Sequence, residues 1–230
     1  MTDTAPEHAH HHHVAAGERP RILVFFDYAC QFCYLDWPRF KRLRKEHDVE
    51  LFLVPFELRP SLPPEGVPLS QIGDEHSDRV KEHMLRMASQ SGLELRFPES
   101  VPNTHFALAA GEFARDLGTQ VHERVHEALF AAYNARGVDI GDLGVIAEVV
   151  ADAGLDSGEV LEALAEGRFD ERIHQFMHIA LGMGINATPA ALICNVLMIG
   201  SRPYRVLEEA LGECVITAAD LDAADASEGA

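Results

Sequence analysis

The early part of the chain carries a buried-strand pattern that runs into a pair of cysteines. Arg21 to Phe26 is an apolar run of β-forming residues, and its length suits a strand inside a sheet. Cys30 and Cys33 follow, and the apolar spacing then becomes helical from Tyr34 to Lys45. Val49 to Phe56 has the pattern of a second strand. A strand, a helix and a strand joined by short links predict a parallel βαβ unit with a right-handed crossover.

The middle of the chain has a different pattern. From about Asp74 to Arg168 the apolar residues recur at helical spacing, and no convincing strand interrupts them. Glycines separate successive stripes, which is typical of helix ends. The stripes begin near Val80, Phe106, Val121, Leu143 and Val160.

The end of the chain returns to strands. Phe169 to Gly182 predicts a helix, and two short apolar runs follow Thr188-Pro189. Asn195 separates these runs, so they predict a hairpin from Ala190 to Ile199. Tyr204 to Glu213 predicts a closing helix. The whole order is therefore βαβ, a helical block, and αββα.

Composition excludes several classes of function. The 230 residues are 47% hydrophobic, which suffices for one core or for one core with a large insertion. The net charge of −18 makes the chain a poor partner for nucleic acid or an anionic membrane. No apolar run approaches the ~20 residues of a membrane span. Met1 to Pro20 lacks the pattern of a secretory signal, so we expect a cytoplasmic protein.

Both ends of the chain are expected to lie outside the folded part. Residues 1–19 form a His-rich tail, which we interpret as disordered. A weak transition-metal site in that tail is the alternative. Residues 217–230 form an acidic tail.

The spacing of Cys30 and Cys33 suits disulfide exchange. At the start of a helix, free backbone N–H groups and the positive end of the helix dipole stabilise a thiolate. The thiolate is the species that attacks a disulfide sulfur. We therefore predict that Cys30 is an exposed nucleophile and that Cys33, one turn further in, resolves the mixed disulfide. Gln31 and Phe32 lie between them and are expected to contact the substrate.

Other roles for the cysteine pair have weaker support. A structural zinc ion usually needs a second pair of ligands, and Cys194 and Cys214 are isolated in the sequence. We therefore predict no metal site and no cofactor. A structural disulfide across so short a loop would remove little entropy from the unfolded chain. Cys194 and Cys214 are interpreted as small buried apolar side chains, with a second disulfide couple as the alternative.

Two further positions have chemistry that suits this site. Asp27 stands three residues before Cys30, where a carboxylate could relay the proton of Cys33. A turn cap or a solvent-facing residue is the equal alternative for Asp27. Pro189 is a candidate for a cis peptide bond, although a loop proline is the commoner case. The backbone of Thr188 and Pro189 could pair with an extended substrate.

These residues match a known family. The segment Phe26 to Tyr34 resembles the active-site segment of DsbA-like thioredoxin-fold oxidoreductases, and it looks similar to the FrnE-like branch. Pro55 to Pro60 and Pro102 to Thr104 resemble further marks of that branch, and Thr188-Pro189 stands where the family has its cis-proline. The chain departs from the family at Gln31, where a proline is usual.

The resemblance implies an α/β protein with a thioredoxin fold and an all-helical domain inserted between its second and third strands. On this basis we expect a thioredoxin-like domain over residues 20–62 and 168–216, and a helical insertion over residues 63–167. It further implies that Cys30 is the nucleophile, Cys33 the resolving thiol and Pro189 the cis residue that faces the substrate.

Four functions are consistent with this sequence. The first is a thiol–disulfide oxidoreductase, whose partners would be protein or small-molecule thiols and disulfides, with glutathione as a possible co-substrate. The second is a glutathione-dependent isomerase or transferase of the kappa and hydroxychromene-carboxylate isomerase type. That neighbouring branch uses a serine-type site, which the pair Cys30 and Cys33 argues against. The third is an interaction module without catalysis. The fourth is a metal-binding or redox-sensing protein that uses the His-rich tail.

Overall fold

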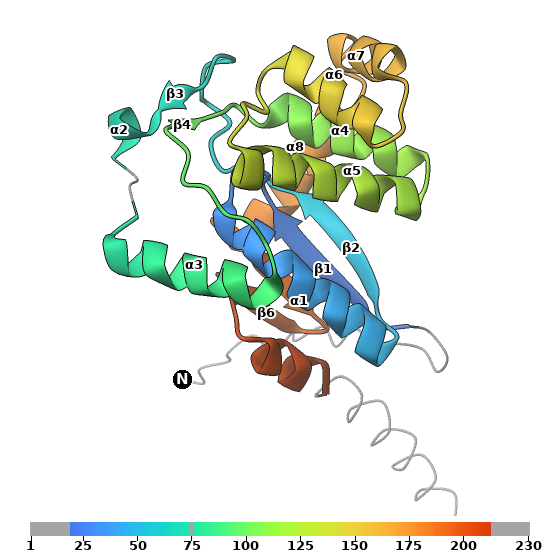
Figure 1. Ribbon diagram of the computed structural model, residues 1–230. Coiled ribbons are helices and arrows are strands. Elements are labelled where there is room, and N and C mark those ends of the chain that lie inside the picture. Colours follow the sequence, from blue (N-terminus) through green and yellow to red (C-terminus); the bar gives the residue numbers. More distant parts are fainter. Residues whose placement is uncertain (1–18, 74–75, 213–230) are drawn as a thin grey trace, which may run out of the picture.

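The computed structural model describes residues 19–73 and 76–212 (Figure 1). A four-stranded sheet lies at its centre, with the order β2-β1-β5-β6. β1 (Arg21–Phe26) pairs in parallel with β2 (Glu50–Pro55), as the βαβ pattern predicts. β5 (Ala190–Ile193) runs antiparallel to β1 and to β6 (Val196–Ile199). The His-rich tail before residue 19 and the acidic tail after residue 216 lie outside the described residues.

Helices cover both faces of the sheet. Successive side chains of β1 point to opposite faces, and the apolar side chains on each face pack against a helix. Val24 and Phe26 belong to the core cluster that α1 (Gln31–His47) shares, whereas Phe25 packs in a second cluster with Ala180 of α8 (Asp170–Gly182). The closing helix, residues 204–212, packs on the α1 side through Leu207 and Leu211. α1 continues through Pro38 as one helix.

The helical insertion begins after β2 and returns to the sheet through α8. Figure 1 shows most of its helices gathered beyond one end of the sheet, while α3 (Asp78–Ser91) lies apart from them and against α1. This arrangement confirms an α/β fold with a helical insertion between the second and third strands of the central sheet. The insertion contains α2 (Leu69–Ile72), α3 (Asp78–Ser91), α4 (His105–Asp116), α5 (Thr119–Ala131), the π-helix η1 (Ala132–Arg136), α6 (Leu143–Asp152) and α7 (Ser157–Ala165).

Two details differ from the sequence-based expectation, while the turn between β5 and β6 agrees with it. This turn consists of Cys194, with a φ of 53°, and the expected Asn195. β3 (Val67–Pro68) and β4 (Ser100–Val101) form a small antiparallel ribbon, which is too short to show alternation in the sequence. Leu85 of α3 belongs to the apolar stripe that begins near Val80 and was therefore expected to be buried, but it is 48% exposed.

In the described ranges, 19–73 and 76–212, none of the helices combines the length and the apolar character that crossing a bilayer requires.

Candidate active site

The two cysteines lie at the first turn of α1, directly after the turn that ends β1. Cys30 is the N-cap residue, and its Sγ accepts a hydrogen bond from the backbone N–H of Cys33 at 3.4 Å. The same sulfur lies 3.4 Å from the backbone oxygen of Thr188, to which its thiol donates. Both cysteines are free thiols. The turn after β1, the helix start and the segment before β5 therefore meet at one sulfur atom.

Cys30 is not exposed at the helix start, which corrects the expectation from the sequence. It is 8% exposed and Cys33 is 5% exposed. Residues of the helical insertion cover this end of α1, and the position of an insertion relative to the first helix has no signature in the local sequence. Cys30 is instead reached from a cavity that it lines.

The environment separates the two thiols electrostatically. Burial raises the pKa of Cys30, but the Cys33 thiol, the side chain of Thr188 and the Cys33 N–H together outweigh burial and hold this pKa below its ordinary value. Burial and the adjacent Cys30 sulfur raise the pKa of Cys33 well above the ordinary value. Cys30 is therefore the thiol that ionises first, while Cys33 keeps its proton.

Asp27 is fully buried beside this turn and is not a solvent-facing residue. Its Oδ1 accepts the N–H of Ala29 at 2.8 Å, so it does cap the turn. Its Oδ2 accepts the N–H of Leu58 at 2.8 Å and the hydroxyl of Thr104 at 3.1 Å. Burial raises the pKa of Asp27 to about 6, although these three hydrogen bonds oppose the rise, and the nearby Glu57 adds to it.

An ion-pair network lies next to Asp27, and sequence reasoning missed it. His105 Nδ1 is 2.6 Å from Glu57 Oε1, and His105 Nε2 is 3.0 Å from Asp170 Oδ1. The hydrogen bond to Glu57 contributes most to raising the pKa of His105, to about 9. Glu57 lies inside the segment Pro55 to Pro60, which carried part of the family resemblance. The sequence therefore indicated that the segment around Glu57 matters, but it did not indicate the partner of Glu57, which is His105 on α4.

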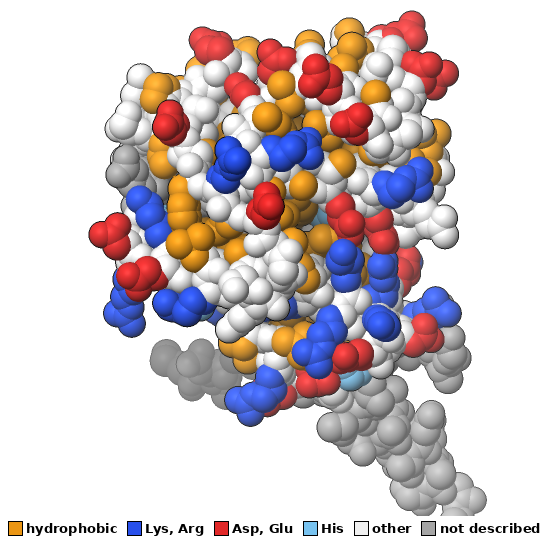
Figure 2. Space-filling model, viewed as in Figure 1, with side chains coloured by type: hydrophobic (Ala, Val, Ile, Leu, Met, Phe, Trp, Pro, Cys, Tyr) orange, Lys and Arg blue, Asp and Glu red, His pale blue; other side chains and the backbone are white. Residues whose placement is uncertain are grey.

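A cavity of about 720 Å³ opens onto Cys30. Of the predicted substrate residues, Gln31, Phe32 and Thr188 line it. Figure 2 shows apolar side chains gathered in this region, between α3 and the helices of the insertion. The lining that sequence reasoning did not predict includes three basic side chains and two aromatic ones: Arg59, His76, Lys81, Phe97 and Tyr133.

Two of the predicted substrate residues, Gln31 and Pro189, are engaged within the protein. Gln31 also borders the cavity, but it is 7% exposed, and its Nε2 donates to the backbone oxygen of Arg96 at 2.8 Å. The Thr188–Pro189 peptide bond is cis, as the family resemblance implied. The oxygen of Pro189 accepts the N–H of Gly200 at 2.7 Å, so it is already used inside the hairpin.

Cys194 lies in the turn between β5 and β6, not at the start of α1. Cys194 is disulfide-bonded, which differs from its interpretation as a small buried apolar side chain. Its partner is neither Cys30 nor Cys33, because both of these are free thiols. Cys214 lies outside the described residues.

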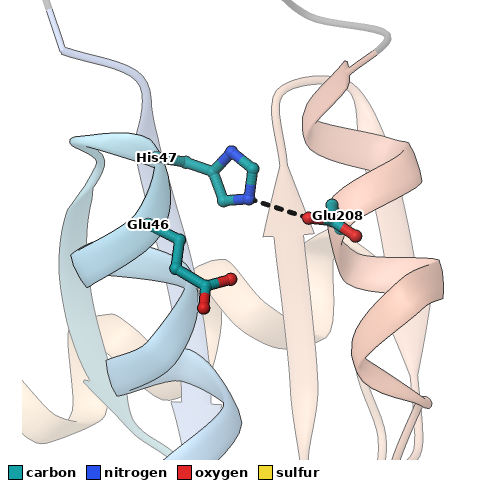
Figure 3. A group of neighbouring side chains, drawn as sticks. All are labelled: Glu46, His47 and Glu208. Carbon is teal, nitrogen blue, oxygen red and sulfur yellow. Dashed lines mark hydrogen bonds and ion pairs between the residues drawn. The ribbon is translucent and has the colours of Figure 1, made fainter.

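One cluster of metal-ligating side chains lies at the opposite end of α1. Glu46, His47 and Glu208 bring ligand atoms within 4.8 Å of one another (Figure 3). Glu46 also accepts hydrogen bonds from Arg42 at 2.9 Å and from the Tyr204 hydroxyl at 2.5 Å. The bonds of Glu46 with Tyr204 and of His47 with Glu208 join α1 to the closing helix. Over residues 19–73 and 76–212, neither Cys30 nor Cys33 belongs to such a cluster.

Known structures share this fold. A probable DsbA oxidoreductase from Streptomyces coelicolor has a TM-score of 0.76 and 22% identity, covering 85% of this chain and 90% of its own. A 2-hydroxychromene-2-carboxylate isomerase has a TM-score of 0.70 and 20% identity, covering 87% and 98%. The cytosolic disulfide reductase DsbM from Pseudomonas aeruginosa with GSH has a TM-score of 0.59 and 16% identity, covering 88% and 99%.

The sequence identifies the family directly. Residues 21–212 match the DSBA-like thioredoxin domain, and this range includes β1, the cysteine pair, the insertion and the β5–β6 hairpin. The chain therefore belongs to the family of DSBA-like thioredoxin domains.

Proposed function

We propose that this protein is a thiol–disulfide oxidoreductase in which Cys30 attacks and Cys33 resolves. One observation carries the proposal: the Cys30 sulfur caps α1, accepts the Cys33 N–H and opens onto a cavity. A helix start and hydrogen bonds to the sulfur favour the thiolate, which is the reactive species. The family also points to chemistry on thiols and disulfides.

The reaction divides into two exchanges. The Cys30 thiolate attacks one sulfur of a substrate disulfide, so a Cys30–substrate disulfide forms and the other substrate sulfur leaves with the electron pair. Cys33 then loses its proton and attacks the Cys30 sulfur. The Cys30–Cys33 disulfide closes and the second substrate thiolate leaves. The substrate is thereby reduced, and the Cys30–Cys33 dithiol is oxidised to a disulfide. In the assay a small dithiol reduces this disulfide again. The same two exchanges in reverse order oxidise a substrate dithiol.

Asp27 fits the role of base in the second exchange. Cys33 keeps its proton because its pKa is raised, so a base must take that proton before Cys33 can attack. Asp27 has a pKa of about 6 and is therefore mostly ionised at neutral pH, yet it is basic enough to accept a proton.

The test compares the wild type with Cys30→Ser in the reduction of 2-hydroxyethyl disulfide by dithiothreitol. Wild-type protein should accelerate the reaction, and Cys30→Ser should return it to the uncatalysed rate. Cys33→Ser should accumulate the mixed disulfide on Cys30, which intact-mass spectrometry detects. Equal rates for wild type and Cys30→Ser would overturn the proposal.

A second candidate is a glutathione-dependent isomerase or transferase. The basic side chains of Arg59, Lys81 and His76 around the cavity suit a small thiol that carries carboxylates. One structural neighbour is named as such an isomerase. This candidate predicts saturable glutathione binding, and turnover that survives Cys33→Ser. The first candidate predicts that Cys33→Ser abolishes turnover.

We assign the protein to the FrnE-like branch and to the cytoplasm as part of the same proposal. The sequence segments Pro55 to Pro60 and Pro102 to Thr104 support the branch. A neighbour named as a cytosolic disulfide reductase with GSH supports both the compartment and glutathione as a possible co-substrate. Protein or small-molecule thiols and disulfides are then the partners, and no bound cofactor is required.

A further inference from the structure

Residues 93–99, the wall segment, form one side of the cavity above Cys30. The segment leaves the C-terminal end of α3 and leads to β4. Leu93, Leu95 and Phe97 pack against the main core cluster, which fixes every second side chain of the segment inward. Phe97, with Pro98 and Glu99, lines the cavity. The wall is therefore built from a segment without helix or strand structure of its own.

Two side chains from the first turn of α1 hold this wall. Gln31 Nε2 donates to the oxygen of Arg96 at 2.8 Å, and the Tyr34 hydroxyl donates to the oxygen of Glu94 at 3.1 Å. Gln31 and Tyr34 are three residues apart, so both project from the same face of α1. The helix that carries Cys30 therefore also carries the groups that place the wall.

The wall is held from the insertion as well. The Arg96 N–H donates to the oxygen of Asn134 in η1 at 2.7 Å. The oxygen of Glu99 accepts the Leu69 N–H at 2.8 Å. The wall is therefore held by hydrogen bonds on both of its sides in this structure.

We infer that Gln31 and Tyr34 are specificity-determining residues, because they hold the wall segment over Cys30 and so limit the site to slender disulfides. Such a substrate is a small-molecule disulfide or a single extended peptide. This inference rests on the proposed function and names its substrate class.

The geometry around Cys30 explains this choice of substrate. Only 8% of Cys30 is exposed, so the attacked sulfur has to enter the cavity. The cavity volume of about 720 Å³ accommodates a small disulfide or a short stretch of extended chain. A disulfide in the surface of a folded protein would bring neighbouring chain against Phe97 and Pro98.

The test removes the two hydrogen-bond donors without changing side-chain size. Gln31→Met and Tyr34→Phe are made singly and together. Gln175→Met and Tyr204→Phe serve as matched controls, since both side chains make hydrogen bonds on other surfaces. Each protein is alkylated at Cys30 with iodoacetamide and with a polyethylene-glycol maleimide, and each is assayed on 2-hydroxyethyl disulfide and on native insulin.

The measured quantity is the rate of Cys30 alkylation by iodoacetamide divided by the rate with the bulky maleimide, normalised to the same ratio for a free cysteine peptide. In wild type this relative ratio should be far above one. In each single variant this relative ratio should fall by roughly fivefold, and in the double variant by roughly 25-fold, because each lost hydrogen bond shifts the balance between the bonded and the displaced wall by roughly fivefold. The insulin to hydroxyethyl disulfide ratio of kcat/KM should rise in parallel. The controls should match wild type.

An unchanged ratio in both single variants and in the double variant would overturn the inference. So would a wild-type protein that reduces insulin as readily as the small disulfide. Failure of the proposed function is a different result: neither disulfide is reduced, and iodoacetamide reacts with Cys30 only as it does with an ordinary thiol. Tyr34→Phe is mild enough to keep the test valid if Gln31→Met fails to fold.

Discussion

At the residue scale, the site depends on groups that cannot be replaced by others of similar size. Asp27 accepts three hydrogen bonds in a fully buried position. An amide at this position would present an N–H₂ group to the Leu58 N–H, which is also a donor. The carboxylate is therefore matched to its surroundings, and its raised pKa makes it the group whose titration should be visible in the chemistry.

We predict that Asp27→Asn slows resolution of a Cys30 mixed disulfide by about 100-fold, which is typical for loss of a general base. In wild type the rate should rise with pH through about 6, as Asp27 loses its proton, and the variant should lack this rise. The rate of resolution is measured by stopped-flow detection of thionitrobenzoate as it is released from its mixed disulfide with Cys30. Asp36→Asn is the matched control, because Asp36 is also buried with a pKa of about 6. A retained inflection in Asp27→Asn would contradict the assignment.

Gly111 of α4 is required by its close approach to Tyr28. A Cβ at this position would lie 2.7 Å from the Tyr28 hydroxyl oxygen. Gly111→Ala should therefore lower the free energy of unfolding by about 1–3 kcal/mol, as overpacking of a core does. Tyr28→Phe removes the clashing atom and should recover part of this loss in the double variant.

Urea denaturation of the four proteins in this cycle measures the coupling. Gly182→Ala in α8 is the control, since a Cβ there meets nothing within 4 Å. Additive losses in the Gly111→Ala and Tyr28→Phe pair would show that the hydroxyl is not the obstacle.

The sequence predicted where individual site residues lie better than it predicted how accessible they are. The spacing of Cys30 and Cys33 after an apolar strand identified the cysteine pair. The burial of Cys30 could not be predicted, because it depends on segments that lie far away in the sequence, such as Thr188, whose backbone oxygen the Cys30 sulfur contacts. Gln31 was expected to face substrate for the same reason, since its partner, the backbone oxygen of Arg96, is also distant in sequence.

At the element scale, the start of α4 is fastened to the loop after β2 beside the active site. Thr104 and Leu58 both donate to Asp27, while the adjacent His105 and Glu57 pair with each other. Asp170, at the start of α8, contacts the second ring nitrogen of His105, Nε2. One imidazolium therefore joins the insertion, the loop after β2 and α8 next to the reacting groups.

This tie should make stability depend on pH in the alkaline range. The pKa of His105 is about 9 in the folded state and near 6.5 when unfolded, so its stabilisation is complete below about pH 6.5 and is lost as pH rises through 9. Between pH 6.5 and pH 9, the free energy of unfolding should vary less in His105→Gln than in the wild type. Urea denaturation at three pH values across this range measures it. His83→Gln is the control, because His83 lies exposed on α3. Equal slopes for wild type and His105→Gln would rule out this tie.

Helical periodicity predicted the long elements of the insertion, because each buries one face against the core. α4, for example, covers the predicted stripe that starts at Phe106. The β3–β4 ribbon and η1 were not predictable in this way. The ribbon has two residues per strand, and η1 makes a tertiary contact that the local sequence does not reveal, the bond from Asn134 to the backbone oxygen of Tyr28. The predicted domain boundaries at residues 62 and 168 remain predictions.

At the scale of the whole molecule, the interface between α1 and α5 buries two neutral histidines. His126 lies among Phe26, Tyr28 and Trp37, and its Nδ1 is 3.3 Å from the Tyr28 hydroxyl. Nε2 of His122 is buried and has no hydrogen-bond partner in the described chain. Burial lowers the pKa of His122 to about 3 and that of His126 well below its ordinary value.

These histidines should make the fold sensitive to acid. The unfolded chain binds their protons near pH 6.5, whereas folded His122 does so only near pH 3, so stability is lost as pH falls through this interval. In His122→Leu the loss should be smaller by up to about 1.4 kcal/mol per pH unit. At pH 7 the variant should not be less stable, because the unpaired Nε2 is removed. Urea denaturation at pH 7, 5 and 4 measures both effects. A steeper acid limb in the variant would contradict this assignment.

The most direct test of the whole account is the pH dependence of alkylation at each cysteine, followed by mass spectrometry of the reduced full-length protein. The account predicts that Cys30 reacts with iodoacetamide with an apparent pKa below the ~8.5 of a free thiol, and that Cys33 is alkylated only at much higher pH. Cys33→Ser should keep Cys30 as the first thiol to react. An ordinary pKa at Cys30, or alkylation of Cys33 before Cys30, would contradict the account.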